Sequence, residues 1–204
     1  SPMTYIRRLI ILLIATLCCA AAGLAMAAEL PKQIDVRIIT GGIGDIRCDA
    51  QYQLTFRANR IFMSLAALNC GGSNISSPAQ GVVFPVNGKE KQNFQCEQKE
   101  GSTTRKCSNG ESYKFDALSG SGSYLEETTR TVESKFNGGT LTLTTQSRVE
   151  GLVKVVFDSQ VTQKVVLKLS GNGCSISAFD TAITTKGMPG SKTKMLKQVS
   201  CTVQ

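Results

Sequence analysis

The cysteines are the residues of this chain whose chemistry follows most directly from their number and spacing. Of the 8 cysteines, Cys18 and Cys19 lie in an apolar N-terminal segment. The remaining cysteines are Cys48, Cys70, Cys96, Cys107, Cys174 and Cys201. An even number of thiols in an exported chain is typical of disulfides, and the absence of a C-x-x-C pair argues against a metal site. We predict pairing between nearest neighbours, although the sequence alone also allows other pairings.

Four lysines near the C-terminus form a second group with recognisable chemistry. These residues surround a turn that contains Gly187 and Gly190, and they are Lys186, Lys192, Lys194 and Lys197. Such a group is predicted to contact an anion, either an acidic polymer or a lipid phosphate surface. The alternative is a solvated loop that keeps an edge strand soluble. No aromatic side chains lie between the lysines, so base stacking with nucleic acid is not supported.

The sequence contains few of the residue patterns that enzymes use for catalysis. The chain has no histidine, which excludes Ser-His-Asp and Cys-His catalysis and histidine-ligated zinc. Carboxylates remain for acid–base work, but no pattern brings any two of them together; the candidates are Asp45, Asp49, Asp116, Asp158 and Asp180. Glu126 and Glu127 are adjacent and would point to opposite faces of a strand. We therefore predict a protein that is not an enzyme and has no metal or cofactor.

The N-terminus has the pattern of a secretory signal peptide. Arg7 and Arg8 precede an apolar run, and Ala25-Met26-Ala27 has the small-residue form of a cleavage site. We predict a hydrophobic signal helix over residues 1–27 and a mature chain of 28–204, located in the periplasm or secreted. The alternative is a retained anchor, the one case in which we expect contact with a membrane. Removal of the two arginines would lower the net charge from +8 to 8 − 2 = +6.

The rest of the chain consists mainly of apolar and polar residues in alternation, which is typical of β-strands with one buried face. The clearest strands are predicted at 140–149, 152–157, 163–170 and 174–185, with turns at Glu150-Gly151 and at 171–173. Residues 57–69 fit a helix or a strand, and we favour the strand because Cys48 and Cys70 would then bridge a hairpin. Asn87-Gly88 predicts a two-residue hairpin turn between strands 81–86 and 91–96.

Two further segments have predicted roles at the surface. The polar residues between Cys96 and Cys107 are expected to form an exposed loop closed by its own disulfide. Residues 124–136 have few apolar anchors and are expected to form an edge strand. No repeat or linker divides the mature chain, so we predict one all-β domain, an antiparallel meander forming a β-barrel or a two-sheet sandwich.

The functional prediction is a binding protein of the bacterial cell envelope. It would hold a lipid-like ligand inside a barrel, or an anionic envelope polymer such as an acidic glycan on its basic surface. The alternative is a structural or interaction subunit, an assembly component or inhibitor, that joins a partner protein through an exposed strand edge. A sizeable apolar cavity between the sheets would favour the ligand carrier.

Overall fold

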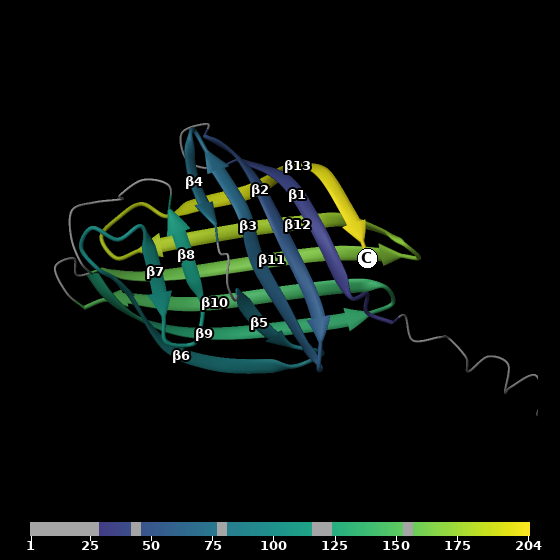
Figure 1. Cartoon of the computed structure of the whole chain (residues 1–204), viewed down its shortest axis with the longest axis horizontal. Coiled ribbons are helices and arrows are strands. Elements are labelled where there is room, and N and C mark those ends of the chain that lie inside the picture. Colours follow the sequence, from purple (N-terminus) through teal and green to yellow (C-terminus); the bar gives the residue numbers. More distant parts are fainter. Residues whose placement is uncertain (1–28, 42–45, 77–80, 116–123, 153–156) are drawn as a thin grey trace, which may run out of the picture. The chain divides into compact units, whose positions relative to one another are not determined.

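The computed structural model describes residues 29–41, 46–76, 81–115, 124–152 and 157–204. The expected signal segment, Gly42 to Asp45, Asp116 and most of the expected strand 152–157 lie outside these ranges. The described chain from Pro31 onward is all-β, and twelve of its thirteen strands form a closed antiparallel barrel (Figure 1). The predicted all-β class, antiparallel pairing and barrel alternative are therefore confirmed.

The strands have the following bounds: β1 Gln33–Gly41, β2 Arg47–Arg57, β3 Arg60–Cys70, β4 Ser73–Ser76, β5 Val82–Pro85, β6 Lys89–Gln98, β7 Thr104–Cys107, β8 Ser112–Phe115, β9 Tyr124–Asn137, β10 Thr140–Gly151, β11 Asp158–Ser170, β12 Gly173–Thr185 and β13 Ser191–Val203.

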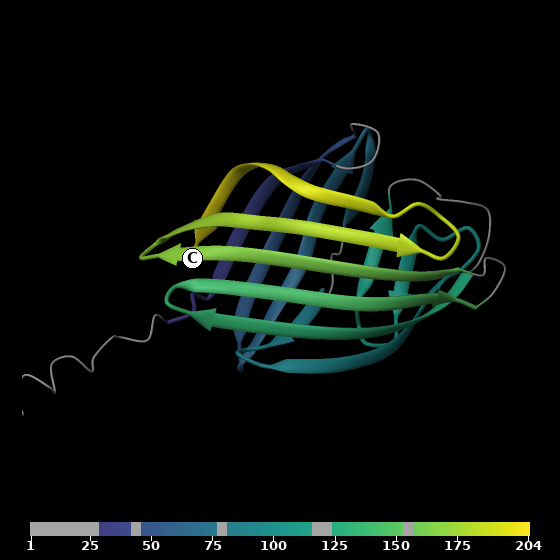
Figure 2. The ribbon, with the colours of Figure 1, turned by 180° about the vertical axis from the view of Figure 1, so that it is seen from behind.

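The ring follows the chain for most of its circumference. β9 to β13 pair in sequence order, β13 pairs with β1, and β1 to β4 continue in order (Figure 2). The ring is completed by β8, β7 and β6, which follow β4 in reverse order before β6 pairs with β9. Among the described strands β5 pairs with β3 alone and stands outside the ring. The meander is thus continuous except around β5 to β8.

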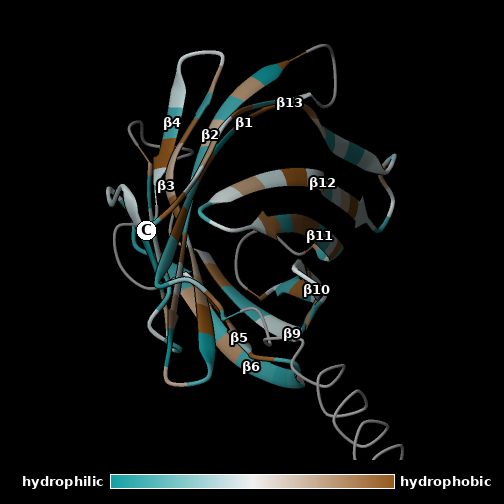
Figure 3. Cartoon of the chain, turned by 90° about the vertical axis from the view of Figure 1, so that its right-hand side faces the viewer, coloured by the Kyte–Doolittle hydropathy of each residue, from teal (hydrophilic) through white to brown (hydrophobic). Residues whose placement is uncertain are grey.

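Alternation of side chains separates the inside of the barrel from the outside. Figure 3 shows the strands β9 to β12 facing β1 to β4, with apolar and polar residues in alternation along the ribbons. The inward residues of β1 and β10 are fully buried, as at Ile34, Ile38, Leu141 and Leu143. A period of two therefore positions the apolar core, as the sequence predicts.

Three disulfides join neighbouring strands, and all have the predicted partners. Cys48 bonds Cys70 between β2 and β3, Cys96 bonds Cys107 between β6 and β7, and Cys174 bonds Cys201 between β12 and β13. Disulfides persist in oxidising compartments, so the chain belongs outside the reducing cytosol. No helix among the described residues is long and apolar enough to cross a bilayer.

Residues 57–69 form a strand, as favoured, since β3 covers Arg60–Cys70. The turn predicted at Glu150-Gly151 is wrong, because both residues belong to β10 and Glu150 pairs with Asp158 of β11. The N–H of Gly151 still donates to the carbonyl oxygen of Phe157. This continuing ladder moves the connection to residues beyond Gly151.

The hairpin predicted at Asn87-Gly88 is also wrong. β5 pairs with β3, and β6 pairs with β9, so the two flanking strands are not joined by backbone hydrogen bonds to each other. Asn87 does have a positive φ of 49°, but its side-chain oxygen accepts a hydrogen bond from the N–H of Phe136. Its own N–H donates to Ser134 Oγ. These contacts hold the corner against β9 and direct the chain away from a tight return.

The segment expected at an edge is central instead. β9 pairs with β10 along one side and with β6 along the other. Although many of its residues are polar, only one face of the strand is exposed to solvent, because Glu126, Thr128 and Ser134 are buried inside the barrel. The strand edge on which the predicted partner role depended is therefore already occupied.

Candidate functional site

The interior of the barrel has two unlike halves. Apolar side chains of β1, β2, β3, β10 and β11 fill one half as a continuous core. Around β6 to β9, by contrast, inward positions carry polar and charged groups, among them Gln98, Glu111, Glu126 and Arg130. Burying charges is costly unless they are paired. The unusual half of the interior is therefore the first place to look for function.

Glu111 and Arg130 form the centre of this polar half. Arg130 Nη1 contacts Glu111 Oε1, and Nη2 lies 3.3 Å from Oε2, so the pair is two-pronged. Tyr113 donates to Glu111 Oε2 at 2.9 Å, and Asn109 Nδ2 donates to Oε1 at 3.0 Å. The guanidinium also lies 4.8 Å from the centre of the Phe94 ring. The carboxylate is therefore held by an extended network.

A second ion pair lies in the same half, where Arg105 of β7 contacts the buried Glu126 of β9. Among the described residues the charged side chains of this interior are thus two arginines and two glutamates, which balance. The side-chain oxygen Oε1 of Gln98 is buried and has no hydrogen-bond partner in the described part of the chain. Its amide nitrogen donates to the carbonyl oxygen of Ser102 at 2.9 Å.

These groups surround a hollow of about 290 Å³, here called the interior cavity. Its polar lining comes from the two arginines, Glu111, Tyr113, Thr128 and Ser147, and its apolar lining comes from Ile75, Phe94, Phe115, Val149 and Val161. The lining residues belong to β4 and β6 to β11, apart from Glu111, which stands just before β8. A hollow that combines apolar walls with a few converging polar groups is the usual form of a small-molecule site.

A second hollow of about 490 Å³, here called the side hollow, meets the interior cavity. It lies between β3, β5 and β6, where no backbone pairing joins β5 to β6. The hydrogen bond from Gln92 Nε2 to the carbonyl oxygen of Val83 and the pair of Arg60 with Glu90 span this gap. Phe94 and Glu111 line both hollows, so these two side chains separate them.

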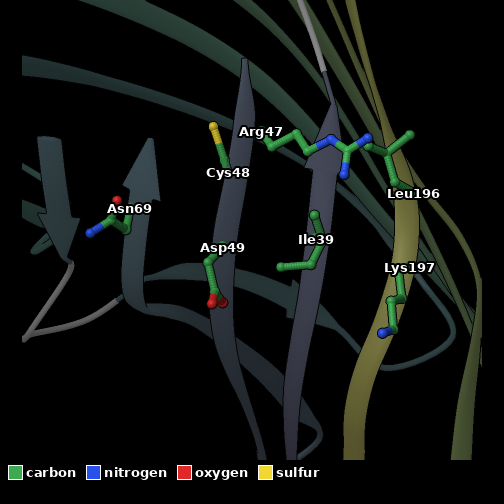
Figure 4. Close-up of a pocket in the computed structure, with 7 residues that line it drawn as sticks. All are labelled: Ile39, Arg47, Cys48, Asp49, Asn69, Leu196 and Lys197. Carbon is green, nitrogen blue, oxygen red and sulfur yellow. The ribbon is translucent and has the colours of Figure 1, made fainter. Parts of the chain in front are cut away.

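The four lysines predicted to form a group are spread along the C-terminal strand and the turn before it. Lys192, Lys194 and Lys197 are exposed on β13, and Lys186 stands after the end of β12, at the start of the turn before β13. Lys197 is the member of the group that lines a hollow, together with Ile39, Arg47 and Leu196 (Figure 4). The structure therefore separates Lys186 from Lys197 along most of a strand.

The predicted carboxylate candidates do not meet in the described residues. Asp49 pairs with Arg37 on the outer face, and Asp158 pairs with Arg148. Asp180 stands opposite Lys164 and Lys194 in the ladder, while Asp45 and Asp116 lie outside the described ranges. Glu126 is buried and Glu127 exposed, as adjacent strand residues must be. The described residues hold no group of three or more metal-ligating side chains.

The polar interior was missed by reasoning from sequence. Glu111, Arg130 and Arg105 read as ordinary surface residues, because polar alternation does not say which face is inward. One signal was present: Glu126, Thr128 and Arg130 alternate with polar neighbours on a strand that lacks apolar anchors. Comparisons of the chain with protein-family models, curated proteins and solved structures find no match.

Proposed function

We propose that this protein is an exported carrier that binds a small, neutral, amphipathic molecule in the interior cavity. The observation that supports it is the half-filled barrel: a hollow of about 290 Å³ remains beside buried charges that form ion pairs with one another. A closed barrel can hold one small ligand in its lumen. The disulfides support a periplasmic or secreted location for this binding.

The charge balance of the interior argues for a neutral ligand. Arg130 and Arg105 are each opposed by a glutamate, so a further charge would have no counter-ion there. Bringing an unpaired charge into a low-dielectric interior costs several kcal/mol. Hydroxyl or amide groups would instead find partners, since Ser147, Thr128 and Tyr113 line the cavity.

The size of the cavity argues for a short molecule. An engineered apolar cavity of about 150 Å³ binds benzene, so 290 Å³ holds on the order of a dozen non-hydrogen atoms. A complete two-chain lipid is far larger. The lipid-like ligand expected from the sequence is thereby narrowed to a short-chain or single-ring amphiphile.

The test uses three probes with the same chain and different heads: 1-octanol, octanoate and octylammonium. Binding is measured by calorimetry and by amide chemical shifts of the isotope-labelled protein. We expect 1-octanol to cause the largest shifts of the Phe94, Tyr113 and Val161 amides. Equal shifts of these three amides by all three probes, or octanol shifts confined to the outer surface, would contradict the proposal.

A matched pair of variants separates the cavity from general surface effects. Val161 and Thr162 are neighbours on β11, the first lining the cavity and the second exposed. Val161→Phe fills the hollow and is expected to abolish 1-octanol binding while the protein stays folded. Thr162→Phe adds the same ring outside and should leave binding unchanged. If V161F binds 1-octanol as the natural chain does, the ligand is not in the barrel.

A further inference from the structure

The C-terminal strand β13 carries two irregularities where it pairs with β1. Ile39 pairs with Lys197 and Thr40 with Met195, so Leu196 is an extra residue without a partner. Arg37 pairs with Ser200 and Ile38 with Gln198, so Val199 is a second extra residue. Such β-bulges redirect side chains and are frequent beside functional sites.

Both bulges place an apolar side chain in solvent. Leu196 is 56% exposed and Val199 is 43% exposed. Leu196 lies over Gly41, where a Cβ atom would come within 2.8 Å of its Cδ1. Single exposed apolar residues are ordinary, but Leu196 and Val199 lie on the same stretch of β13 and form a small patch that favours an apolar partner.

A hollow of about 690 Å³ opens beside this patch, and we call it the outer groove. Figure 4 shows Arg47 extending across the end of β1 toward Leu196, with Ile39 and Lys197 below. Asn69 and Asp49 form the far side, on β3 and β2. The groove therefore crosses four adjacent strands and has apolar residues between two cations.

The charges of the outer groove are not balanced. Asp49 is held by Arg37, whose Nη2 lies 2.6 Å from its Oδ2, and this pair lowers the pKa of the Asp49 carboxyl mainly through the hydrogen bond. Arg47 and Lys197 have no ion pair within the described ranges, and Lys194 stands opposite Gly41 on the same face. The groove thus presents excess positive charge around an apolar floor.

We propose that the outer groove binds a single-chain amphiphile with an oxyanion head, phosphate or carboxylate. Arg47 and Lys197 take the head, and Ile39 and Leu196 contact the first part of the chain. A polymer without an apolar part would leave the exposed side chain of Leu196 in water. The site is distinct from the interior cavity, whose lining shares no residue with it.

The test compares dodecyl phosphate and dodecanoate with dodecyltrimethylammonium and dodecyl maltoside, all below their micelle concentrations. Binding is followed by calorimetry and by amide shifts of labelled protein. We expect the two anions to bind and to shift the amides of Ile39, Arg47, Leu196 and Lys197. The ratio of the phosphate and carboxylate affinities tells which head the groove prefers. Equal binding of the cationic or the maltoside amphiphile would overturn the proposal.

Exposed positions allow variants that leave the fold intact. The double variant Arg47→Glu/Lys197→Glu and the single variant Leu196→Ser are each expected to weaken dodecyl phosphate binding at least about tenfold, which corresponds to ~1.4 kcal/mol. The controls are the double variant Lys164→Glu/Lys168→Glu, two exposed lysines on β11 whose reversal changes the net charge equally, and Leu152→Ser, an exposed leucine at another loop. A loss as large with the controls would show that net charge or hydrophobicity alone drives binding.

Two further experiments distinguish this site from polymer binding at the surface and from binding in the interior cavity. Polygalacturonate carries carboxylates and no apolar chain, so it should bind weakly and be insensitive to Leu196→Ser. Strong binding of this polymer that survives L196S would contradict the amphiphile. The V161F variant has its interior cavity filled and should still bind dodecyl phosphate. Loss of that binding in V161F would place the anion in the barrel instead.

Discussion

Arg130 of β9 and Glu111, just before β8, form an ion pair inside the barrel, with the arginine side chain 12% exposed and the glutamate 2% exposed. The two residues are 19 positions apart in the chain and come from strands that are not neighbours in the ring. The pair therefore ties opposite parts of the polar half together. It also stands where the interior cavity meets the side hollow.

Removing one member of this pair is expected to be severely destabilising. Glu111→Gln leaves the Arg130 guanidinium buried without a counter-charge, which typically costs about 3–5 kcal/mol. Urea unfolding of the two proteins measures the difference. The control is Asp49→Asn, which breaks an exposed pair with Arg37 and should cost no more than about 1 kcal/mol.

The double variant Glu111→Met/Arg130→Met tests whether the pair itself stabilises the fold. Replacing a buried ion pair by apolar residues is often nearly neutral, so the double variant should be more stable than E111Q. Octanol binding should change in the double variant, because two polar lining groups are lost. A double variant less stable than E111Q would mean that the network supports the barrel wall itself.

The disulfide Cys174–Cys201 is expected to hold its two strands together locally, a role that Cys48–Cys70 does not have. β12 and β13 pair at Gly173 with Thr202 and again from Asp180 with Lys194, but not between. Cys174–Cys201 and the hydrogen bond from the N–H of Ile176 to Gln198 Oε1, 2.8 Å long, cross this opening. Replacing both cysteines by serine should cost about 3 kcal/mol and expose the amides around Ile176 to hydrogen exchange.

The matched control is the double serine variant of Cys48 and Cys70, which face each other in a ladder of β2 with β3 that is paired on both sides of its single β-bulge. It should lose a similar amount of global stability without local exchange at the bridged strands. If both variants open locally to the same extent, the ladder does not protect β2 and β3. Gln198→Ala added to the Cys174/Cys201 variant should widen its exchange further.

Two tyrosines are expected to make stability fall in alkali. Burial raises the pKa of Tyr113 to about 12, with a further contribution from Glu111, and burial raises the pKa of Tyr52 to about 12. The folded chain therefore keeps phenolic protons that the unfolded chain releases near pH 10. Their stabilisation is complete below about pH 10 and is lost as pH rises toward 12.

Absorbance at 295 nm measures this directly, because the chain has no tryptophan. We expect Tyr52→Phe and Tyr113→Phe each to remove one late-titrating phenol and to reduce the loss of urea resistance between pH 10 and 11.5. Titration of both phenols near pH 10 in the folded protein would show that water reaches them.

A glycine permits the close approach of β5 to β3. A Cβ atom at Gly81 would lie 1.9 Å from the carbonyl oxygen of Met63, which is backbone and cannot rotate away. Gly81→Ala is expected to cost about 1–3 kcal/mol through a forced backbone shift. Gly190→Ala is the control, because its Cβ would meet the carbonyl oxygen of Ile183 at an ordinary 3.5 Å. Thermal unfolding of both variants compares the costs.

The amino-acid pattern alone indicates the all-β fold class and favours disulfides between neighbouring cysteines, although it does not exclude other pairings. Alternation in segments such as 140–149 reports one buried face, which is a local property of each strand. Pairing of Cys48 with Cys70 is favoured by the chain, because the two cysteines bridge one hairpin if residues 57–69 form a strand. Predictions from local sequence fail where a turn is held by contacts with a distant part of the chain. Asn87 is an example, because its hydrogen bonds are to Ser134 and Phe136, on a strand about fifty residues away.

Tertiary structure alone decides which polar residues face inward and which charges meet. Glu111 and Arg130 become partners only because closing the ring places β6 and β7 between β8 and β9 and turns both residues toward the same hollow, a relationship that no spacing in the chain encodes. The outer groove likewise depends on register shifts between β1 and β13, which are distant in sequence. Side-chain periodicity is local, whereas register and ring closure are set by the packing of the whole barrel.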